Sequence, residues 1–438
     1  MPLWVPQHNS LDFISTQAVV IFGRILRIRG CVCQDQTRAL TRAPVRLLSH
    51  VQTRSRTNVS QDDANKSTSY NYVNSGFNIS YADGSGATGD YATDTISLGG
   101  ATIPGLQFGI GYQSTSPESV LGIGYALHEA QVILTGANPY PNLPELMVRL
   151  GLINSPAYSL WLNDLAASTG SLLFGGVNTE KYHGQLSSLP IQTGPGQLQP
   201  EELFITLTGV QYGGSSLVSF RADAALLDSG SSLIYLPDEI AGAIYKVVGA
   251  QIDQSRGVAV VPCSMAKSPQ TLDFGFSGAT ISVPMSELVL PGPNSQLSGT
   301  FGQSGSSQKL CTLAIIPNGG ANTVLGDPFL RSAYVVYDLA NNMISIAQTN
   351  FNATKDRILE IGTGPSAVPD AVLIQNPVTA TARGVASASG RLRPTAAASG
   401  TASGAKPQKT GGAVHGRSSP MGGALAGVVG AIAVAFVL

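Results

Sequence analysis

The sequence of 438 residues has few charged side chains and few cysteines, and each shortage excludes a class of protein. Asp, Glu, Lys and Arg make up 12% of the chain, and there are four cysteines. No cluster of Cys and His has the spacing of metal ligands, and no glycine-rich loop suits a phosphate, so we expect neither a metal nor an organic cofactor. The 50 glycines and 26 prolines favour short strands joined by turns.

The net charge of −1 conceals a strong asymmetry along the chain. Residues 58–349 hold 9 Lys and Arg against 21 Asp and Glu, a net charge of −12, while the two flanks together carry +11. An acidic central region argues against nucleic-acid binding. It suits a secreted protein that works at low pH, but the charge taken alone favours the plainer interpretation, that it only keeps the protein soluble.

The cysteines fall into two unlike pairs. Cys263 and Cys311 are far apart in sequence and have no neighbouring His or Cys, so a single disulfide in an oxidising compartment is the favoured interpretation, with two buried thiols as the alternative. Cys31 and Cys33 have the wrong spacing for a zinc knuckle.

The periodicity of residues 58–350 predicts an all-β protein that is long enough for two lobes with separate cores. Residues 77–81 and 90–98 alternate as strands around the turn signal Asp83-Gly84-Ser85-Gly86, which predicts a hairpin. Further strands are expected at 101–111, 171–176 and 344–347, and short helices at 144–150 and 239–252.

Residues 1–57 do not form a coherent pattern. Eight Arg and no Lys fall between Arg24 and Arg56, and the apolar run Val19 to Phe22 is too short to span a membrane. We interpret the segment as aberrant, derived from non-coding sequence, with a polybasic partner-binding arm as the alternative.

The C-terminal part has the layout of a GPI-attachment signal. Residues 351–420 are predicted to be a stalk rich in Ser, Ala and Gly, followed by a hydrophobic tail at 421–438. Gly411 is the candidate attachment residue and Ser403 a second choice, and a short tail anchor is the competing interpretation. Glycosylation sequons at Asn58, Asn65, Asn78 and Asn352 carry weight only beside such a signal.

One motif carries chemistry: Asp228-Ser229-Gly230-Ser231-Ser232, which lies between the apolar runs 224–227 and 233–237. Taken alone it could be an ordinary turn between two strands. It resembles the second catalytic motif of the pepsin-like aspartic peptidases, and residues 140–176 are most similar to the fungal yapsin and candidapepsin branch. The resemblance implies a bilobal fold and peptide hydrolysis at acid pH by two carboxyl groups that share a proton.

The resemblance also assigns roles to other residues. Tyr81, Asp83, Gly84 and Ser85 would belong to the flap that covers substrate; an ordinary hairpin tyrosine is the plain alternative for Tyr81. Gly230 and Ser231 would hold the Asp228 carboxylate, and Ser229 would reach toward the other lobe. Residues 120–125 and 324–331 resemble the elements behind the two catalytic loops, which makes Asp327 structural. Cys263 and Cys311 match a disulfide of the C-terminal lobe. The lobes are expected at 58–188 and 189–350.

The sequence departs from the family at one point: it has no second Asp-Ser/Thr-Gly triplet. Leu3-Trp4-Val5-Pro6 is similar to the segment that follows the family's first motif, so we expect a lost upstream exon and a retained intron, with the N-terminal lobe left incomplete. The hypothesis is a monomeric aspartic endopeptidase of the cell surface, acting on proteins or peptides and attached to the membrane through a GPI anchor. The alternative is an inactive pepsin-like peptide-binding protein.

Overall fold

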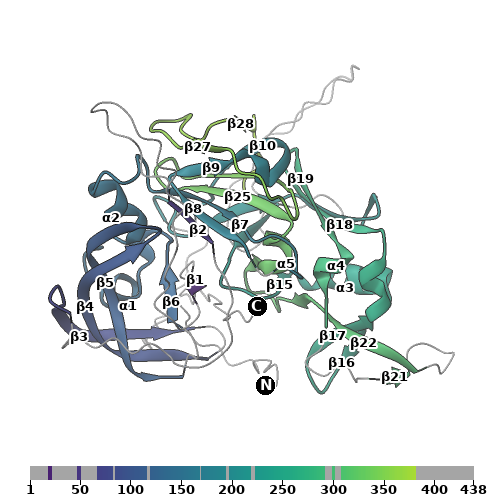
Figure 1. Cartoon of the computed structure of the whole chain (residues 1–438). Coiled ribbons are helices and arrows are strands. Elements are labelled where there is room, and N and C mark those ends of the chain that lie inside the picture. The colour runs from purple at the N-terminus through teal and green to yellow at the C-terminus, as the bar shows by residue number, and fades with distance from the viewer. Residues whose placement is uncertain are drawn as a thin grey trace, which may run out of the picture.

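The computed structural model describes residues 18–21, 47–50, 67–81, 84–115, 119–167, 169–193, 197–218, 222–291, 298–300 and 307–380. Strands dominate these residues and the helices are short, so the predicted all-β class is confirmed. Figure 1 shows two groups of strands and helices, one on each side of a sheet to which both halves of the chain contribute. The predicted bilobal arrangement is therefore confirmed as well.

A seven-stranded sheet joins the two lobes. Its order is β2 (Leu47–His50), β8 (Ser171–Phe174), β7 (Ala157–Trp161), β25 (Ala333–Asp338), β26 (Met343–Thr349), β10 (Tyr182–Pro190) and β28 (Ala371–Leu373). Strands β7 and β25 are buried along their whole length. Tyr158 and Tyr337, which face each other across these strands, stack with ring centroids 4.9 Å apart.

The N-terminal lobe is built on a three-stranded antiparallel sheet, here called the hairpin sheet. It consists of β3 (Asn71–Ser80), β4 (Gly86–Leu98) and β5 (Ala101–Ser114). Strand β1 (Ala18–Ile21) pairs with β6 (Ser119–Gly122), and the chain continues through η2 (Ala126–His128), α1 (Ala130–Thr135) and α2 (Leu143–Arg149). Helix α2 lies within one residue of its predicted bounds, because Asn142 caps its first turn by accepting a hydrogen bond from the Glu145 amide.

The C-terminal lobe contains three smaller sheets. The first has the order β11 (Phe204–Leu207), β14 (Asp223–Leu227), β24 (Thr323–Leu325), β15 (Ile234–Leu236), β23 (Ile315–Pro317). The second has the order β13 (Ser215–Ser216), β12 (Gly209–Tyr212), β18 (Thr271–Phe276), β19 (Ala279–Pro284). The third has the order β16 (Gln251–Asp253), β17 (Val258–Pro262), β22 (Ser307–Leu313), β20 (Val289–Leu290), with β21 (Ser298–Thr300) paired to β22.

The remaining elements of this lobe are helices: α3 (Asp238–Val248), η4 (Cys263–Lys267), α4 (Met285–Leu288) and α5 (Asp327–Leu330). The predicted helix 239–252 ends too late. Gly249 adopts the left-handed conformation, φ 67°, which stops the helix, and the following residues form β16. Cys263 and Cys311 form the predicted disulfide, with their Cα atoms 4.9 Å apart.

Residues 351–380 belong to the fold, so the predicted start of the stalk at 351 is wrong. Strand β27 (Ile358–Glu360) pairs with β9 (Gly176–Asn178), and β28 extends the central sheet. Lys181, in η3 (Thr179–Lys181), donates to the carbonyl oxygen of Ala353 over 2.7 Å and lies 3.1 Å from Asp356. The prediction failed because apolar residues scattered through this segment, among them Ile361, Ala367 and Val368, are buried in an apolar cluster of the fold.

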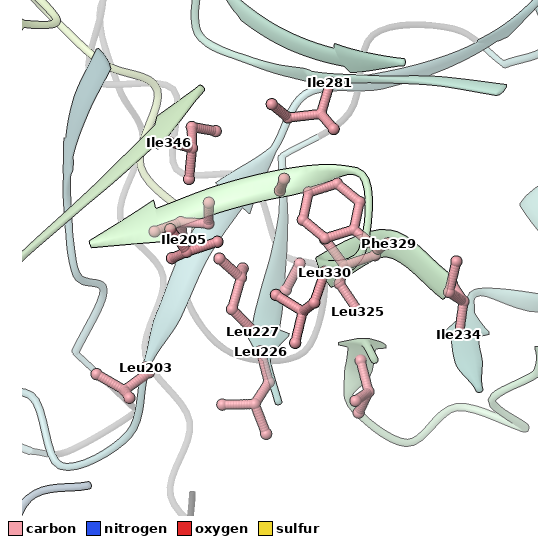
Figure 2. Close-up of a cluster of buried hydrophobic side chains, with 14 of the residues drawn as sticks. Leu203, Ile205, Leu226, Leu227, Ile234, Ile281, Leu325, Phe329, Leu330 and Ile346 are labelled. Atoms are coloured by element: carbon pink, nitrogen blue, oxygen red, sulfur yellow. The ribbon is translucent and has the colours of Figure 1, made fainter. Parts of the chain in front are cut away.

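A contiguous apolar core surrounds the end of β14. Figure 2 shows Leu226 and Leu227 of β14 beside Leu325 of β24, with Ile234 of β15 nearby. Phe329 and Leu330 of α5 complete this part of the core. The packing fixes the position at which β14 ends, and the next residue is Asp228. No helix among the described residues is long and apolar enough to cross a membrane.

Candidate active site

Asp228 follows directly after β14 and is 1% exposed. Its amide donates to the carbonyl oxygen of Leu325 over 3.2 Å. The four residues before it, 224–227, are apolar and buried, which explains why the strand runs into the core and delivers a carboxyl group there. The structure thus places the sequence-predicted aspartate at the inner end of a buried strand.

The loop after Asp228 holds both oxygens of its carboxyl group. The Gly230 amide donates to Oδ1 over 2.8 Å, and the Ser231 hydroxyl donates to Oδ2 over 2.7 Å. Both hydrogen bonds were expected from the motif. They fix the orientation of the carboxyl group and favour its ionised form, while the catalytic role of Asp228 stays a prediction.

Strand β24 supports this loop from behind. It lies between β14, to which it is parallel, and β15, to which it is antiparallel. At its end Gly326 approaches the loop so closely that a Cβ atom would lie 2.2 Å from the Ser231 carbonyl oxygen. That oxygen also accepts a 2.8 Å hydrogen bond from the Asp327 amide. Only glycine fits at position 326, which explains why the Val-Leu-Gly pattern of residues 324–326 ends in glycine.

Burial dominates the electrostatics of the site. It raises the pKa of Asp228 to about 6, and the hydrogen bonds from Ser231 and Gly230 oppose that rise. Tyr337 of β25, in the seven-stranded sheet, directs its hydroxyl toward the carbonyl oxygen of Leu227, the residue before Asp228. An Asp228 carboxyl with this pKa keeps its proton through most of the acid range, the form that can donate to a carbonyl oxygen.

A buried ion-pair network next to the loop was missed by the sequence analysis. Arg331 donates from Nε to Oε2 of Glu287, and its Nη1 atom lies 3.6 Å from Oδ2 of Asp327. Burial raises the pKa of Asp327, while the charge of Arg331 opposes the rise. Oε1 of Glu287 accepts from the Leu165 amide over 3.2 Å, so the network also reaches the β7–β8 loop. Glu287 and Arg331 are 44 residues apart, and no local pattern joins them.

The predicted flap corresponds to the tip between β3 and β4. The Tyr81 amide donates to the Ser85 carbonyl oxygen over 2.8 Å, and the Gly84 amide donates to that of Tyr81 over 3.0 Å. Gly84 has φ 79°, which this turn requires. Tyr81 is 7% exposed. Asp83, the other predicted tip residue, lies outside the described residues.

The N-terminal lobe repeats part of the arrangement around Asp228. Strand β6, with its Val120-Leu121-Gly122 sequence, pairs antiparallel with β1. In the same way, β24 with its Val-Leu-Gly sequence pairs antiparallel with β15. Strands β1 and β2 lie within the segment 1–57 that we interpreted as aberrant, and that interpretation stays a prediction.

The structure describes some of the predicted modification sites. Asn78 is exposed on β3. Asn352 is exposed in a left-handed turn, φ 56°, and its Nδ2 atom donates to Oδ2 of Asp164 over 2.5 Å. Asn58, Asn65, Ser403 and Gly411 lie outside the described residues.

Two further titratable groups escaped the sequence analysis because nothing in their local sequence marks them. Oε2 of Glu129 accepts a 3.0 Å hydrogen bond from the Tyr140 hydroxyl, and its charge acts on Tyr91 of β4. His128 has its Nε2 atom 3.8 Å from Oε1 of Glu202, too long for a hydrogen bond. Burial lowers the pKa of His128 to about 4.

Comparison with known proteins gives a consistent result. The sequence model of a family described as "Eukaryotic aspartyl protease" matches residues 3–349. A "Probable aspartic-type endopeptidase opsB" from Aspergillus oryzae is 53% identical over 323 residues, 72% of this chain and 64% of that protein. A protein of the same name from Aspergillus fumigatus is 52% identical over 322 residues, with the same two coverages, 72% and 64%. The chain therefore spans slightly less than two thirds of these relatives.

One solved structure extends the comparison to three dimensions. The crystal structure of an aspartic proteinase from Irpex lacteus superposes with a TM-score of 0.55 at 22% identity, covering 67% of this chain and 86% of that one. At this identity the likeness concerns the fold.

Proposed function

The chain belongs to the eukaryotic aspartyl protease family, and from this premise we propose that it is an aspartic-type endopeptidase in which Asp228 is one of two catalytic carboxyl groups. The observation that carries the proposal is the buried Asp228 carboxyl group, held at both oxygens by Gly230 and Ser231. Its substrates would be proteins or peptides, and it would act as a monomer.

The proposed chemistry is hydrolysis by an activated water molecule. Of two carboxyl groups about 3 Å apart, one is ionised and removes a proton from water, and the other donates a proton to the scissile carbonyl oxygen. The two groups titrate as a unit. An acid pH optimum follows, because the pair must keep one proton.

A second candidate function rests on one observation. The sequence has a single Asp-Ser/Thr-Gly triplet, that of Asp228, and no second triplet identifies the partner aspartate. A chain without the partner would be a pepsin-like protein that binds peptides and does not cleave them. We propose that the segment 1–57 stands in place of the sequence that carries the partner, and sequencing the 5′ end of the native transcript tests this.

Cleavage and retention assays separate the two functions. The full chain is incubated at pH 3 to 7 with a mixture of unfolded proteins, with and without pepstatin, and the products are identified by mass spectrometry. The enzyme predicts pepstatin-sensitive cleavage that is strongest at acid pH. The binding protein predicts retention of peptides on the immobilised chain without any product.

We further propose a location at the cell surface through a GPI anchor, with Gly411 as the attachment residue and N-glycans at the four sequons. The support is compositional: a stretch rich in Ser, Ala and Gly precedes the uninterrupted small or apolar residues 424–438. Release of the protein from intact cells by a phosphatidylinositol-specific phospholipase C is expected. Retention after that treatment, with release by detergent alone, would support the tail anchor instead.

A further inference from the structure

Residues 351–380, here called the strap, cover one face of the seven-stranded sheet. Side chains alternate between the two faces of a strand, and those that point to this face form an apolar cluster with Ile361, Ala367 and Val368 of the strap. The sheet contributes to this cluster Ala157, Trp161, Leu186, Tyr334, Val336 and Ala347. Figure 1 shows β27 and β28, the two strands of the strap, beside β9 and β10. The strap therefore supplies apolar cover for this face.

The first half of the strap is held by the N-terminal lobe. Strand β27 pairs with β9, and just after it the Ile361 amide donates to the carbonyl oxygen of Gly175 over 2.9 Å. At the start of the strap the Asn352 amide donates to Oδ1 of Asn163 over 2.7 Å. Both acceptors belong to segments that flank β8, so this half of the strap follows the N-terminal lobe closely.

A buried lysine fixes the same half. Lys181 is 4% exposed, and its ammonium group lies 4.4 Å from the centroid of the Trp161 ring. The ammonium group donates to the carbonyl oxygen of Ala353 over 2.7 Å and lies 3.1 Å from Oδ1 of Asp356. Both oxygens belong to the strap. A buried charge needs such partners, so Lys181 binds the strap strongly.

The second half of the strap is held by the C-terminal lobe. The Val378 amide donates to the Ser277 hydroxyl oxygen over 2.9 Å, in the turn between β18 and β19. The Ala380 amide donates to the hydroxyl oxygen of Thr206, in β11, over 3.1 Å. Ala380 itself is 4% exposed. The strap therefore contacts one lobe with its first half and the other lobe with its second half.

We propose that the strap ties the two lobes together and that each of its halves holds the other in place. Two contacts joined by a short stretch of chain raise each other's effective concentration, so both should open together. The tie fixes the position of the hairpin sheet relative to Asp228. It goes beyond the proposed function, because it holds the lobes whether or not the chain cleaves peptides.

Cutting the strap in the full chain tests the tie. Residues 363–366 form an exposed turn, and the recognition sequence of a site-specific protease is inserted between residues 365 and 366. Hydrogen exchange is measured on this chain before and after the cut. The Ile361 and Ala380 amides should each lose about tenfold or more in protection, because each half then keeps only its own contacts. The same insertion and cut in the exposed turn at residues 213–214, between β12 and β13, is the control and should change neither amide.

A variant at one end of the strap tests whether the effect reaches the other end. Lys181→Met removes the ammonium group but keeps a side chain of similar length over Trp161, and Asp356, 38% exposed, remains in contact with solvent. Protection of the Ala380 amide should fall about tenfold, although it lies in the other lobe. Lys246→Met, an exposed position on α3, is the matched control and should leave Ala380 protected.

The amides of β17, in a sheet that the strap does not pair with, serve as the reference for general destabilisation. Unchanged protection of Ala380 after the cut and in Lys181→Met would overturn the proposal. An equal loss in β17 and at Ala380 would overturn it too, because the strap would then not open as a unit of its own. If the chain cleaves nothing but the exchange responds as expected, the proposed function fails and the tie stands.

Discussion

Gly326 packs so tightly against Ser231 that a Cβ atom at position 326 would lie 2.2 Å from the Ser231 carbonyl oxygen. Through its hydroxyl group, Ser231 also donates to Oδ2 of Asp228. Ser231 therefore links β24 to the Asp228 carboxyl group, on which the proposed chemistry depends.

Gly326→Ala should therefore be strongly destabilising. The added methyl group meets backbone atoms of Ser231 and Leu233 that cannot move without displacing the Asp228 loop, and we expect a loss of about 3 kcal/mol in the free energy of unfolding. Gly242→Ala in α3 is the matched control, because nothing lies within 4 Å of its added Cβ atom. It should stabilise by about 0.5–1 kcal/mol. Urea unfolding at pH 5 measures both, and equal effects would contradict the close approach.

Ser231→Ala should raise the pKa of the Asp228 carboxyl group further. The Ser231 hydrogen bond lowers that pKa, so its removal leaves burial less opposed. A hydrogen bond to a charged group corresponds to about one pH unit. We expect the neutral-side limb of the profile of kcat/KM against pH to move to higher pH by about this amount. Ser232→Ala changes the next hydroxyl group along the chain and should leave the limb in place; a shift in both variants would argue for a general disturbance of the loop.

Stability should fall as pH rises toward neutrality. Burial raises the pKa of Asp228 to about 6 and that of Glu129 to about 7, so the folded state binds these protons more tightly than the unfolded state. Below the unfolded pKa values near 4, both groups contribute fully to the free energy of unfolding. That contribution, at most roughly 3 kcal/mol for each group, is lost as pH rises through 6 and 7.

His128 acts in the opposite direction at lower pH. Burial lowers its pKa to about 4, so stability is lost as pH falls from 6.5 through 4. Thermal unfolding between pH 4 and 8 measures the balance, and we expect a clear decrease in Tm from pH 5 to pH 8. A Tm that rises over this interval would show that Asp228 and Glu129 do not hold their protons in the fold.

Two variants test how much the buried ion pair of Arg331 and Glu287 contributes to stability. Arg331→Met leaves Glu287 as a buried charge without its partner and should cost about 3–5 kcal/mol. The double variant Arg331→Met/Glu287→Met removes both charges and should recover most of that loss. Denaturant unfolding of the two variants and the native chain checks this, and a double variant as unstable as the single one would mean that Glu287 acts chiefly through Leu165.

The sequence predicted what local patterns encode. Turn residues and alternation located the β3–β4 hairpin, the flanking apolar runs located the Asp228 loop, and Cys263 and Cys311 form the expected disulfide. It failed where tertiary packing decides. Residues 351–380 are poor in large apolar groups, yet some of those they have are buried in the fold and one of their strands pairs with β9.

Side-chain pairs from distant segments were equally out of reach. Arg331 and Glu287 meet only because α4 and α5 pack together, and the pKa of Glu129 is raised by a burial that only the folded chain creates. Neither relationship leaves a periodic or motif-like trace in the sequence.

The most direct measurement is cleavage of a peptide substrate at acid pH by the native chain, by Asp228→Asn and by Asp253→Asn. The last variant makes the same substitution in the β16–β17 hairpin. We expect Asp228→Asn to abolish cleavage while its thermal unfolding remains cooperative, and Asp253→Asn to cleave like the native chain. Cleavage by Asp228→Asn at the native rate would contradict the assignment of this carboxyl group to catalysis.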